Sequence, residues 1–452
     1  MEEITAFCPP KIQPKRRARK NHPMGFADRY LKKHRLCGDF TGQPPARHLG
    51  YVVVIPCYNE DRITEVLDAL WKADRPEKAV EVLVAVNASQ ADTPEVHQRN
   101  RQTLREVEDW KGRQTNQTRQ PGENFHVHTL HAPDLPQEKA GAGLARKIAM
   151  DEAVARFNQL NRKDGWIFSL DADTLVEPNY FTALEQHIKK NPRLNAGIFY
   201  FEHPLEGNSY DPAIYEGIVR YELFLRYYNQ ALRWAGYPYA FQTIGSAFAV
   251  RAEAYTKQGG MNTKRAGEDF YFLNKVFQLG HVRDITHTTV CPSPRPSDRV
   301  LFGTGPQVIK WSENPDQTYL TYDPAVFQSL KHFMEQADRF YKATAQQHGE
   351  LLESQDPVLR DFLHAVGFPG ELHRINNNCN SLPAFRKHFF HWFNGLRIIR
   401  FIHTAHEKSL GKVPLHRAAT RLLEWLGHHP PQSYRNLLET YRHLERHNPK
   451  AI

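Results

Sequence analysis

Between residues 50 and about 203, short apolar runs alternate with longer amphipathic segments, and this alternation constrains the fold more than any other feature. The amphipathic segments at 61–73 and 140–157 have apolar residues at helical spacing. The apolar runs predict strands: "YVVVIP", "VEVLVAVN", "FHVHTL" and "GWIFSLDAD". Strands that alternate with helices predict an α/β fold with an open, mostly parallel sheet and helices on both faces.

Beyond residue 203 the regular alternation of apolar runs and amphipathic segments ends. An aromatic helix is predicted at 215–236, a strand running into a helix at 243–255, and an extended loop rich in Pro and Gly at 291–306. From residue 323 the pattern is helical, with prolines expected to end the helices: Pro357, Pro369, Pro383, Pro414 and Pro430. We therefore expect a basic arm at 1–48, an α/β domain at 49–310 and a helical domain at 323–452.

The net charge of +9 is concentrated near the N-terminus. Residues 11–35 contain ten Lys or Arg and one Asp, so the rest of the 452-residue chain sums to zero. This distribution argues against a general polyanion-binding face and makes nucleic acid an unlikely partner. The arm could contact anionic lipid or RNA, with a solvated basic tail as the alternative.

The sequence also bears on location. Its longest apolar run is far shorter than the roughly 20 residues that cross a bilayer, and no signal-type segment opens the chain. The five cysteines form no C-x-x-C pair, which suits a reducing cytosol. We expect a cytoplasmic protein that could be peripheral to the inner face of the membrane. The segment "AFRKHFFHWFNGLRIIRFIHTAH" is expected to be core, with a basic membrane-surface face as the alternative.

Two carboxylates follow the apolar run that begins at Trp166. Residues two apart in a strand point to the same side, so Asp171 and Asp173 would face one point in space. Two anions held together repel unless a cation lies between them or one takes a proton. The pair predicts a cation site, and an ordinary turn is the alternative.

Four motifs in order give the chain a resemblance to a known family. They are Pro56-x-Tyr58-Asn59-Glu60 after the first strand, Arg146 in "GAGLARKIAMDEA", the Asp171-x-Asp173 (DxD) pair, and Gly267-Glu268-Asp269 at a helix start. Over about residues 50–310 the chain resembles a family-2-type glycosyltransferase of the GT-A fold. The resemblance implies a nucleotide-diphospho-sugar donor, a divalent metal (Mn²⁺ or Mg²⁺) and transfer of the sugar to an acceptor hydroxyl.

The resemblance implies roles for several side chains. Asp173 would bind the metal directly, and Asp171 would act through the ribose or a water. His287 would be a further metal ligand, with a solvent-facing histidine as the alternative. The donor would contact a larger set of residues, in which the arginines hold the diphosphate unless they are ordinary surface residues: Pro56, Tyr58, Glu60, Arg146, Arg295 and Arg299.

One position departs from the family pattern. Most relatives have an acidic cluster after the second strand, where an Asp contacts the nucleobase, whereas this chain has Asn87 at the strand end and Asp92 later. An Asn side chain can both donate to and accept from a base edge. The resemblance therefore leaves the usual uridine preference open.

The acidic pair at the predicted helix start is the candidate catalytic base. A helix N-terminus stabilises a carboxylate, and the family match favours Asp269, with Glu268 as runner-up and a purely structural cap as the alternative. The sequence favours an inverting transferase over a retaining one or a non-catalytic sugar-nucleotide-binding scaffold. The acceptor is expected between the 215–236 helix and the C-terminal helices.

Overall fold

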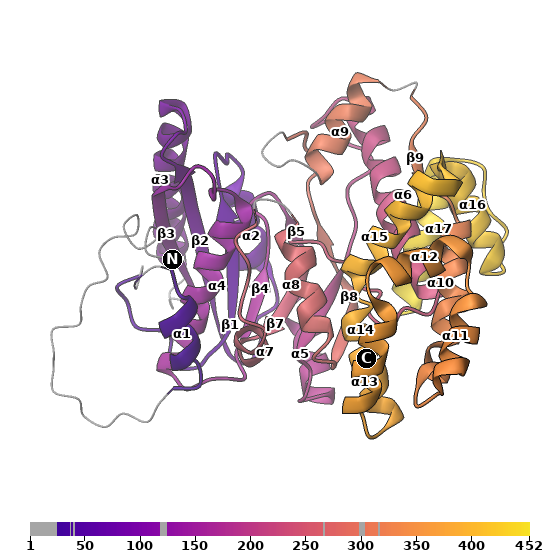
Figure 1. The fold of residues 1–452 in the computed structure, drawn as a ribbon. Helices are drawn as coiled ribbons and strands as arrows, with labels where there is room; N and C mark the ends of the chain where they lie inside the picture. The colour runs from indigo at the N-terminus through magenta and orange to yellow at the C-terminus, as the bar shows by residue number, and fades with distance from the viewer. Residues whose placement is uncertain are drawn as a thin grey trace. The chain divides into compact units, whose positions relative to one another are not determined.

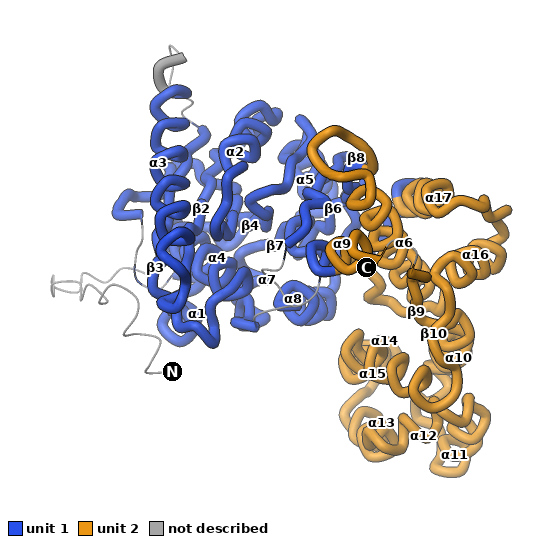
Figure 2. The backbone as a smooth tube through the Cα atoms, turned by 90° about the horizontal axis from the view of Figure 1, so that it is seen from above, with its two compact units in different colours: residues 1–204, 243–306, 446–451 blue, residues 205–242, 307–445, 452 orange. Residues whose placement is uncertain are grey.

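The computed structural model describes residues 25–36, 38, 41–117, 124–264, 267–297, 303–314 and 317–452. These residues divide into two compact units (Figure 2). Unit 1 comprises residues 1–204, 243–306 and 446–451, and unit 2 comprises residues 205–242, 307–445 and Ile452. Residues 205–242, which were expected in the α/β domain, belong to unit 2. Residues 446–451, which were expected in the helical domain, belong to unit 1.

Unit 1 contains an eight-stranded sheet in the order β3-β2-β1-β4-β7-β6-β8-β5 (Figure 1). Strands β3, β2, β1 and β4 are parallel neighbours, and β7 pairs antiparallel with both β4 and β6. The strands span Leu49–Cys57 (β1), Ala79–Ser89 (β2), Phe125–Leu135 (β3), Trp166–Ser169 (β4), Leu175–Val176 (β5), Ala196–Phe201 (β6), Phe248–Arg251 (β7) and Val282–Cys291 (β8). The predicted mostly parallel sheet is confirmed.

Helices surround this sheet (Figure 1). In the helix predicted at 61–73, the apolar residues at helical spacing are all buried. Strand β2 is buried along its whole length, as its unbroken apolar run requires for a central parallel strand. From residue 63 on, the helices of unit 1 span Ile63–Lys72 (α2), Pro94–Gln117 (α3), Ala142–Gln159 (α4), Tyr180–Lys190 (α5), Ala252–Lys257 (α7) and Glu268–Phe277 (α8).

A short helix, α1 (Asp28–His34), lies within the segment expected to be a basic arm. Its Tyr30 is buried, and the Tyr30 hydroxyl donates to Asp151 Oδ1 of α4 at 2.7 Å. Arg35 forms an ion pair with Glu152, the next residue of α4. Residues 25–36 therefore pack as part of unit 1, because Tyr30 enters the core and Arg35 pairs with Glu152 while Lys32 and Lys33 stay exposed.

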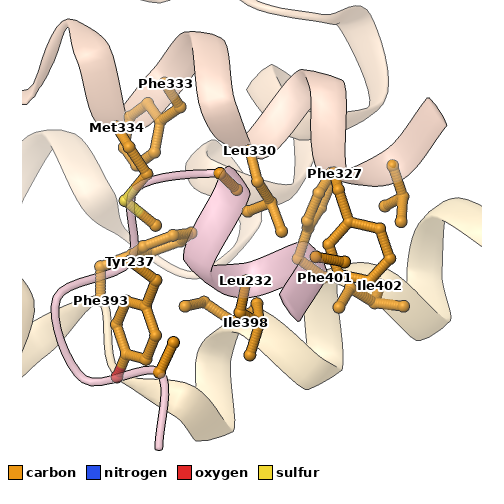
Figure 3. Close-up of a cluster of buried hydrophobic side chains, with 14 of the residues drawn as sticks. Leu232, Tyr237, Phe327, Leu330, Phe333, Met334, Phe393, Ile398, Phe401 and Ile402 are labelled. Carbon is orange, nitrogen blue, oxygen red and sulfur yellow. The ribbon is translucent and has the colours of Figure 1, made fainter. Parts of the chain in front are cut away.

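Unit 2 is a helical assembly built around α6 (Pro212–Trp234) and α10 (Ala325–Glu335). Side chains of both helices meet Phe393, Ile398 and Phe401 in one buried cluster (Figure 3). The other elements from residue 304 on are Thr304–Glu313 (α9), Leu320–Tyr322 (β9), Ala337–Phe340 (η1), Ala345–Glu353 (α11), Pro357–Ala365 (α12), Phe368–Asn378 (α13), Leu382–Trp392 (α14), Gly395–Ala405 (α15), His406–Leu410 (η2), Lys412–Pro414 (β10), Leu415–Trp425 (α16) and Tyr434–His447 (α17).

The prolines of unit 2 begin helices more often than they end them. Pro357, Pro369 and Pro383 occupy the first or second position of α12, α13 and α14. Proline is tolerated there because the first helical N–H groups have no intrahelical acceptor. The apolar side of α14 and α15 is part of the buried cluster, which confirms the prediction that this segment is core. No helix among the described residues has the length and apolar character needed to span a bilayer.

A buried ionic network ties α6 to α17 within unit 2. Arg226 donates to Glu222 Oε1 at 2.8 Å and forms an ion pair with Glu445. Arg442 Nη2 donates to Glu222 Oε2 at 2.8 Å, and Gln242 Nε2 donates to Glu445 Oε1 at 2.9 Å. Two arginines thus balance two glutamates in the interior, which is the condition under which buried charges are tolerated.

Candidate active site

The candidate site lies at the carboxyl ends of the central strands of unit 1. Because β1, β2 and β4 are parallel, the residues that follow them meet at the same edge of the sheet. Pro56 is the penultimate residue of β1, and Tyr58 and Glu60 come directly after that strand. Asp171 and Asp173 follow β4. The parallel sheet therefore places the first and third sequence motifs at one edge.

The two aspartates lie in a turn rather than in the strand. Strand β4 ends at Ser169, and the Thr174 N–H donates to the Asp171 carbonyl at 3.2 Å. Strand alternation therefore does not set the direction of the two carboxylates, which corrects the sequence argument. Instead each carboxylate is paired with a different arginine, and their side chains are 40% and 24% exposed. The pair is held at the surface of the sheet edge by positive charge.

Arg146, near the start of α4, is buried and donates hydrogen bonds to four groups of the site. Its Nη2 donates to Asp171 Oδ1 at 3.0 Å, and its Nε donates to Glu268 Oε1 at 3.3 Å. Its Nη1 donates to Ser169 Oγ at 2.6 Å and to the Gly245 carbonyl at 2.9 Å. Burial alone would lower the pKa of Arg146, but the neighbouring carboxylates outweigh it and raise that pKa. The geometry gives Arg146 a positioning role in place of the expected direct phosphate contact.

Arg295 joins the first motif to the DxD pair. Its Nη1 and Nη2 donate to the two carboxylate oxygens of Glu60 at 3.0 and 2.7 Å. The same Nη2 donates to Asp173 Oδ2 at 3.0 Å. Glu60 is buried and also accepts from the Asp61 and Arg62 N–H groups, so it fixes Arg295 at the sheet edge. Arg299, the second arginine predicted for this loop, lies outside the described residues.

Glu268 and Asp269 begin α8 and have different surroundings. Glu268 is buried and paired with Arg146. Asp269 accepts from the Phe270 N–H at 2.7 Å, and burial together with the nearby Glu268 charge raises the pKa of Asp269 to about 7. A carboxyl group with such a pKa can take up and release a proton at neutral pH. The helix start thus provides one structural carboxylate and one titratable carboxyl group.

Gly245 has no side chain, and this allows Arg146 and Asp269 to approach its backbone closely. A Cβ atom at residue 245 would lie 2.8 Å from Arg146 Nη2 and 3.2 Å from Asp269 Oδ2. Any larger residue would push the arginine and the carboxyl group apart. The sequence analysis did not select this glycine, although it lies in "TIGSAFAV" just before β7.

The nucleobase prediction needs a correction at Asn87. This side chain is buried at the end of β2, and its Nδ2 donates to the Cys57 carbonyl at 3.0 Å and to the Ala85 carbonyl at 3.4 Å. The bond to Cys57 links β2 to β1, and the bond to Ala85 stays within β2. Asp92 is the carboxylate beside the first motif, because it accepts from the Tyr58 hydroxyl at 3.0 Å. The Ser89 N–H also donates to Asp92, which fixes it just beyond β2.

His287 does not join the two aspartates. Pairing between β6 and β8 jumps from Ile285 to Thr289, so His287 lies in a bulge and its side chain is exposed. Its ring lies 5.8 Å from that of His187 on α5, and its carbonyl accepts from Asn179. The bulge turns this histidine toward α5, and the structure corrects its expected role as a metal ligand.

The donor set fits a divalent cation that arrives with a diphosphate. Within the described ranges, no three His, Cys, Asp or Glu side chains form a complete metal-binding group. Mg²⁺ commonly takes only one or two protein carboxylates and fills its other positions with phosphate and water oxygens. Asp171 and Asp173 provide carboxylates of this kind at a partly exposed edge.

Comparisons with known proteins found one matching family model and a set of solved structures similar to this chain. Residues 52–257 match the family model described as Glycosyl transferase family 2. Among solved structures, TarS 1–349 of S. aureus in complex with UDP-GlcNAc is 14% identical with a TM-score of 0.37, and the match covers 77% of this chain and 92% of that chain. Mannosyltransferase PcManGT of Pyrobaculum calidifontis, in complex with GDP-Man and Mn²⁺, is 14% identical with a TM-score of 0.30, covering 93% and 92%. No curated protein matches this chain.

The mostly parallel sheet, the motifs at its edge and the family match together define a glycosyltransferase. The match of residues 52–257 to the glycosyl transferase family 2 model agrees with the resemblance seen in the sequence.

Proposed function

We propose that this glycosyltransferase is inverting and metal-assisted, and that Asp269 is its general base. The observation that carries the proposal is the division of roles at the start of α8. Glu268 is committed to Arg146, whereas Asp269 has a pKa raised to about 7 and lies beside Arg146 and the DxD turn. An inverting transfer needs one such base, and a retaining transfer does not.

The reaction would proceed by a single displacement. The acceptor hydroxyl oxygen forms a bond to the anomeric carbon as the bond between that carbon and the diphosphate oxygen breaks. The bonding electrons leave with the diphosphate, and Asp269 takes the hydroxyl proton and later releases it to solvent. Arg146 holds Asp171 and Glu268 in place through this step.

Asp173, with Asp171 beside it, would hold the divalent cation. Bound Mg²⁺ or Mn²⁺ acts as a Lewis acid that neutralises charge on the leaving diphosphate. Arg295 supplies a second positive charge at the same edge, anchored by Glu60. Tyr58 and Asp92 form a polar pair just beyond the end of β2, and we assign them to the nucleoside part of the donor.

Calorimetry with UDP- and GDP-sugars, each with and without Mn²⁺, tests the donor site. The wild type should bind at least one donor in a metal-dependent manner, and Asp173→Ala should lose the metal-dependent part. Asp164→Ala, a partly exposed aspartate elsewhere in unit 1, is the matched control and should bind like the wild type. Equal binding by the Asp173→Ala variant and the wild type would contradict the cation site.

The anomeric configuration of the product, measured by NMR, separates the two transfer mechanisms. We expect inversion. Retention would show that Asp269 is not needed as a base. A protein that binds the donor but neither hydrolyses nor transfers the sugar, with or without chelator, would instead be a sugar-nucleotide-binding scaffold.

A further inference from the structure

Unit 2 has a charge asymmetry that the proposed transfer reaction does not use. Residues 372–423 contain nine Lys or Arg and a single acid, Glu407. The rest of unit 2 contains ten Lys or Arg and seventeen Asp or Glu. The cations of the segment are Arg374, Arg386, Lys387, Arg397, Arg400, Lys408, Lys412, Arg417 and Arg421. One region of this unit is therefore strongly basic although the unit as a whole is nearly neutral.

These cations are at the surface, and several are not neutralised. All nine are exposed except Arg397, which is half-buried. Arg374 and Arg386 are paired with Glu371 and Asp338. Among the described residues, no ion pair is formed by Lys387, Arg400, Lys408, Lys412 or Arg417. Their charge therefore remains available to an anionic partner.

The cations of α13, α14 and α15 converge in space. Arg397 of α15 lies over the ring of Trp392 at the end of α14, 4.1 Å from the ring centroid. The pKa of the neighbouring His391 is lowered by partial burial and then by His388, Lys387, Arg397 and Arg374, which agrees with this closeness. Arg400 follows Arg397 by three residues on α15, so the two lie on the same side of that helix. We define the basic face as Arg374, Lys387, Arg397, Arg400 and Lys412.

His403, near the end of α15, links the basic face to Lys412 at the start of β10. His403 follows Arg400 by three residues, and the pKa of His403 is lowered by partial burial and by Lys412. The face therefore continues from α13 to the start of β10, with Glu371 beside Arg374 and Arg397 and with Glu407 near His403.

The chemistry of the basic face indicates the kind of partner. Of the Phe and Trp residues of α14, Phe385, Phe389 and Trp392 are buried in the core of unit 2, and Phe390 is partly buried against it. Single-stranded nucleic acids are usually held by exposed aromatic rings as well as by charge. A broad set of long cationic side chains without such rings suits a surface of phosphate headgroups. We propose that the basic face docks the protein on an anionic lipid surface.

Vesicle co-sedimentation of the full chain tests this proposal. The wild type should bind phosphatidylcholine vesicles that contain 30% phosphatidylserine, should lose that binding at high salt, and should not bind pure phosphatidylcholine. Each cation near an anionic membrane contributes roughly a factor of five to binding, so Lys387→Gln, Arg400→Gln and Lys412→Gln together should weaken it roughly 100-fold.

A matched variant separates the basic face from net charge. Lys163→Gln, Lys190→Gln and Arg193→Gln remove three exposed cations of unit 1 and should change vesicle binding by less than roughly threefold. Donor binding should be unchanged in both triple variants, which also shows that they fold. Equal losses in the two variants, or no wild-type binding to phosphatidylserine vesicles, would overturn the proposal. Preferential binding to poly(U) in competition with these vesicles would assign the face to nucleic acid instead.

Discussion

Replacing Asp269 by Asn should stabilise the protein at neutral and higher pH. Burial and the charge of Glu268 raise the pKa of Asp269 from 3.8 to about 7 in the folded protein. Between about pH 4 and pH 7 the folded protein therefore holds this proton while the unfolded chain has released it. The free energy of unfolding falls as pH rises through this interval, and an Asn at position 269 removes the loss.

The magnitude follows from the size of the pKa shift. A difference of about three pKa units corresponds to about 4 kcal/mol, because each unit is worth about 1.36 kcal/mol. We take this value as the largest gain expected above pH 7. At pH 5 the gain should be smaller by about 2 to 3 kcal/mol, since the wild-type carboxyl group is then protonated in the folded state.

Urea unfolding at pH 5, 6, 7 and 8 measures the difference in the free energy of unfolding between Asp269→Asn and the wild type. Asp164→Asn is a control that is expected to change this free energy in the opposite direction. Partial burial opposes ionisation of Asp164, but hydrogen bonds from Arg162 and Lys78 outweigh it and lower its pKa. Asp164→Asn should therefore lose stability at neutral pH. An Asp269→Asn protein that is less stable than the wild type at pH 8, or whose advantage does not grow with pH, would refute the reasoning.

Three further predictions concern contacts outside the reacting groups. Tyr30→Phe should lower the free energy of unfolding by about 1.5–3 kcal/mol, because it removes a hydrogen bond to the buried Asp151 carboxylate; an unchanged urea midpoint would show that α1 is not anchored there. Arg226→Met should cost about 3–5 kcal/mol by leaving Glu445 buried without its ion pair, and a loss below about 1 kcal/mol would contradict the network. Arg295→Gln should tighten Mn²⁺ binding in the absence of donor, because the guanidinium now pairs with a proposed metal-binding carboxylate. Electron paramagnetic resonance measures free Mn²⁺, and weaker binding would show that Arg295 supports the cation instead of competing with it.

The sheet could be predicted from the sequence because its signal is local. Apolar runs of strand length alternate with helical periodicity, and this pattern determines which elements form and that they are mostly parallel. The helix start at Glu268 and Asp269 was visible for the same reason. The prolines of unit 2 were harder to interpret, since a proline one position inside a helix resembles one just beyond the end of the previous helix.

The pairing of side chains at the site could not be predicted in this way. Arg295 reaches Glu60 across 235 residues of sequence, and no periodicity encodes that contact. The bulge that exposes His287 interrupts a stretch that reads as a regular strand. Asn87 has the correct position for a base contact, but burial at the strand end directs its amide protons to backbone carbonyls.

Turnover by Asp269→Asn, measured beside Glu268→Gln with saturating donor and acceptor, tests the central claim most directly. Asn keeps the shape of the side chain and removes its basicity, so donor affinity should stay near the wild-type value while turnover falls by roughly 10²–10⁴. Glu268→Gln should change donor affinity and turnover together, because Glu268 holds Arg146 in place. An Asp269→Asn enzyme that keeps most of its turnover would contradict the assignment of Asp269 as the base.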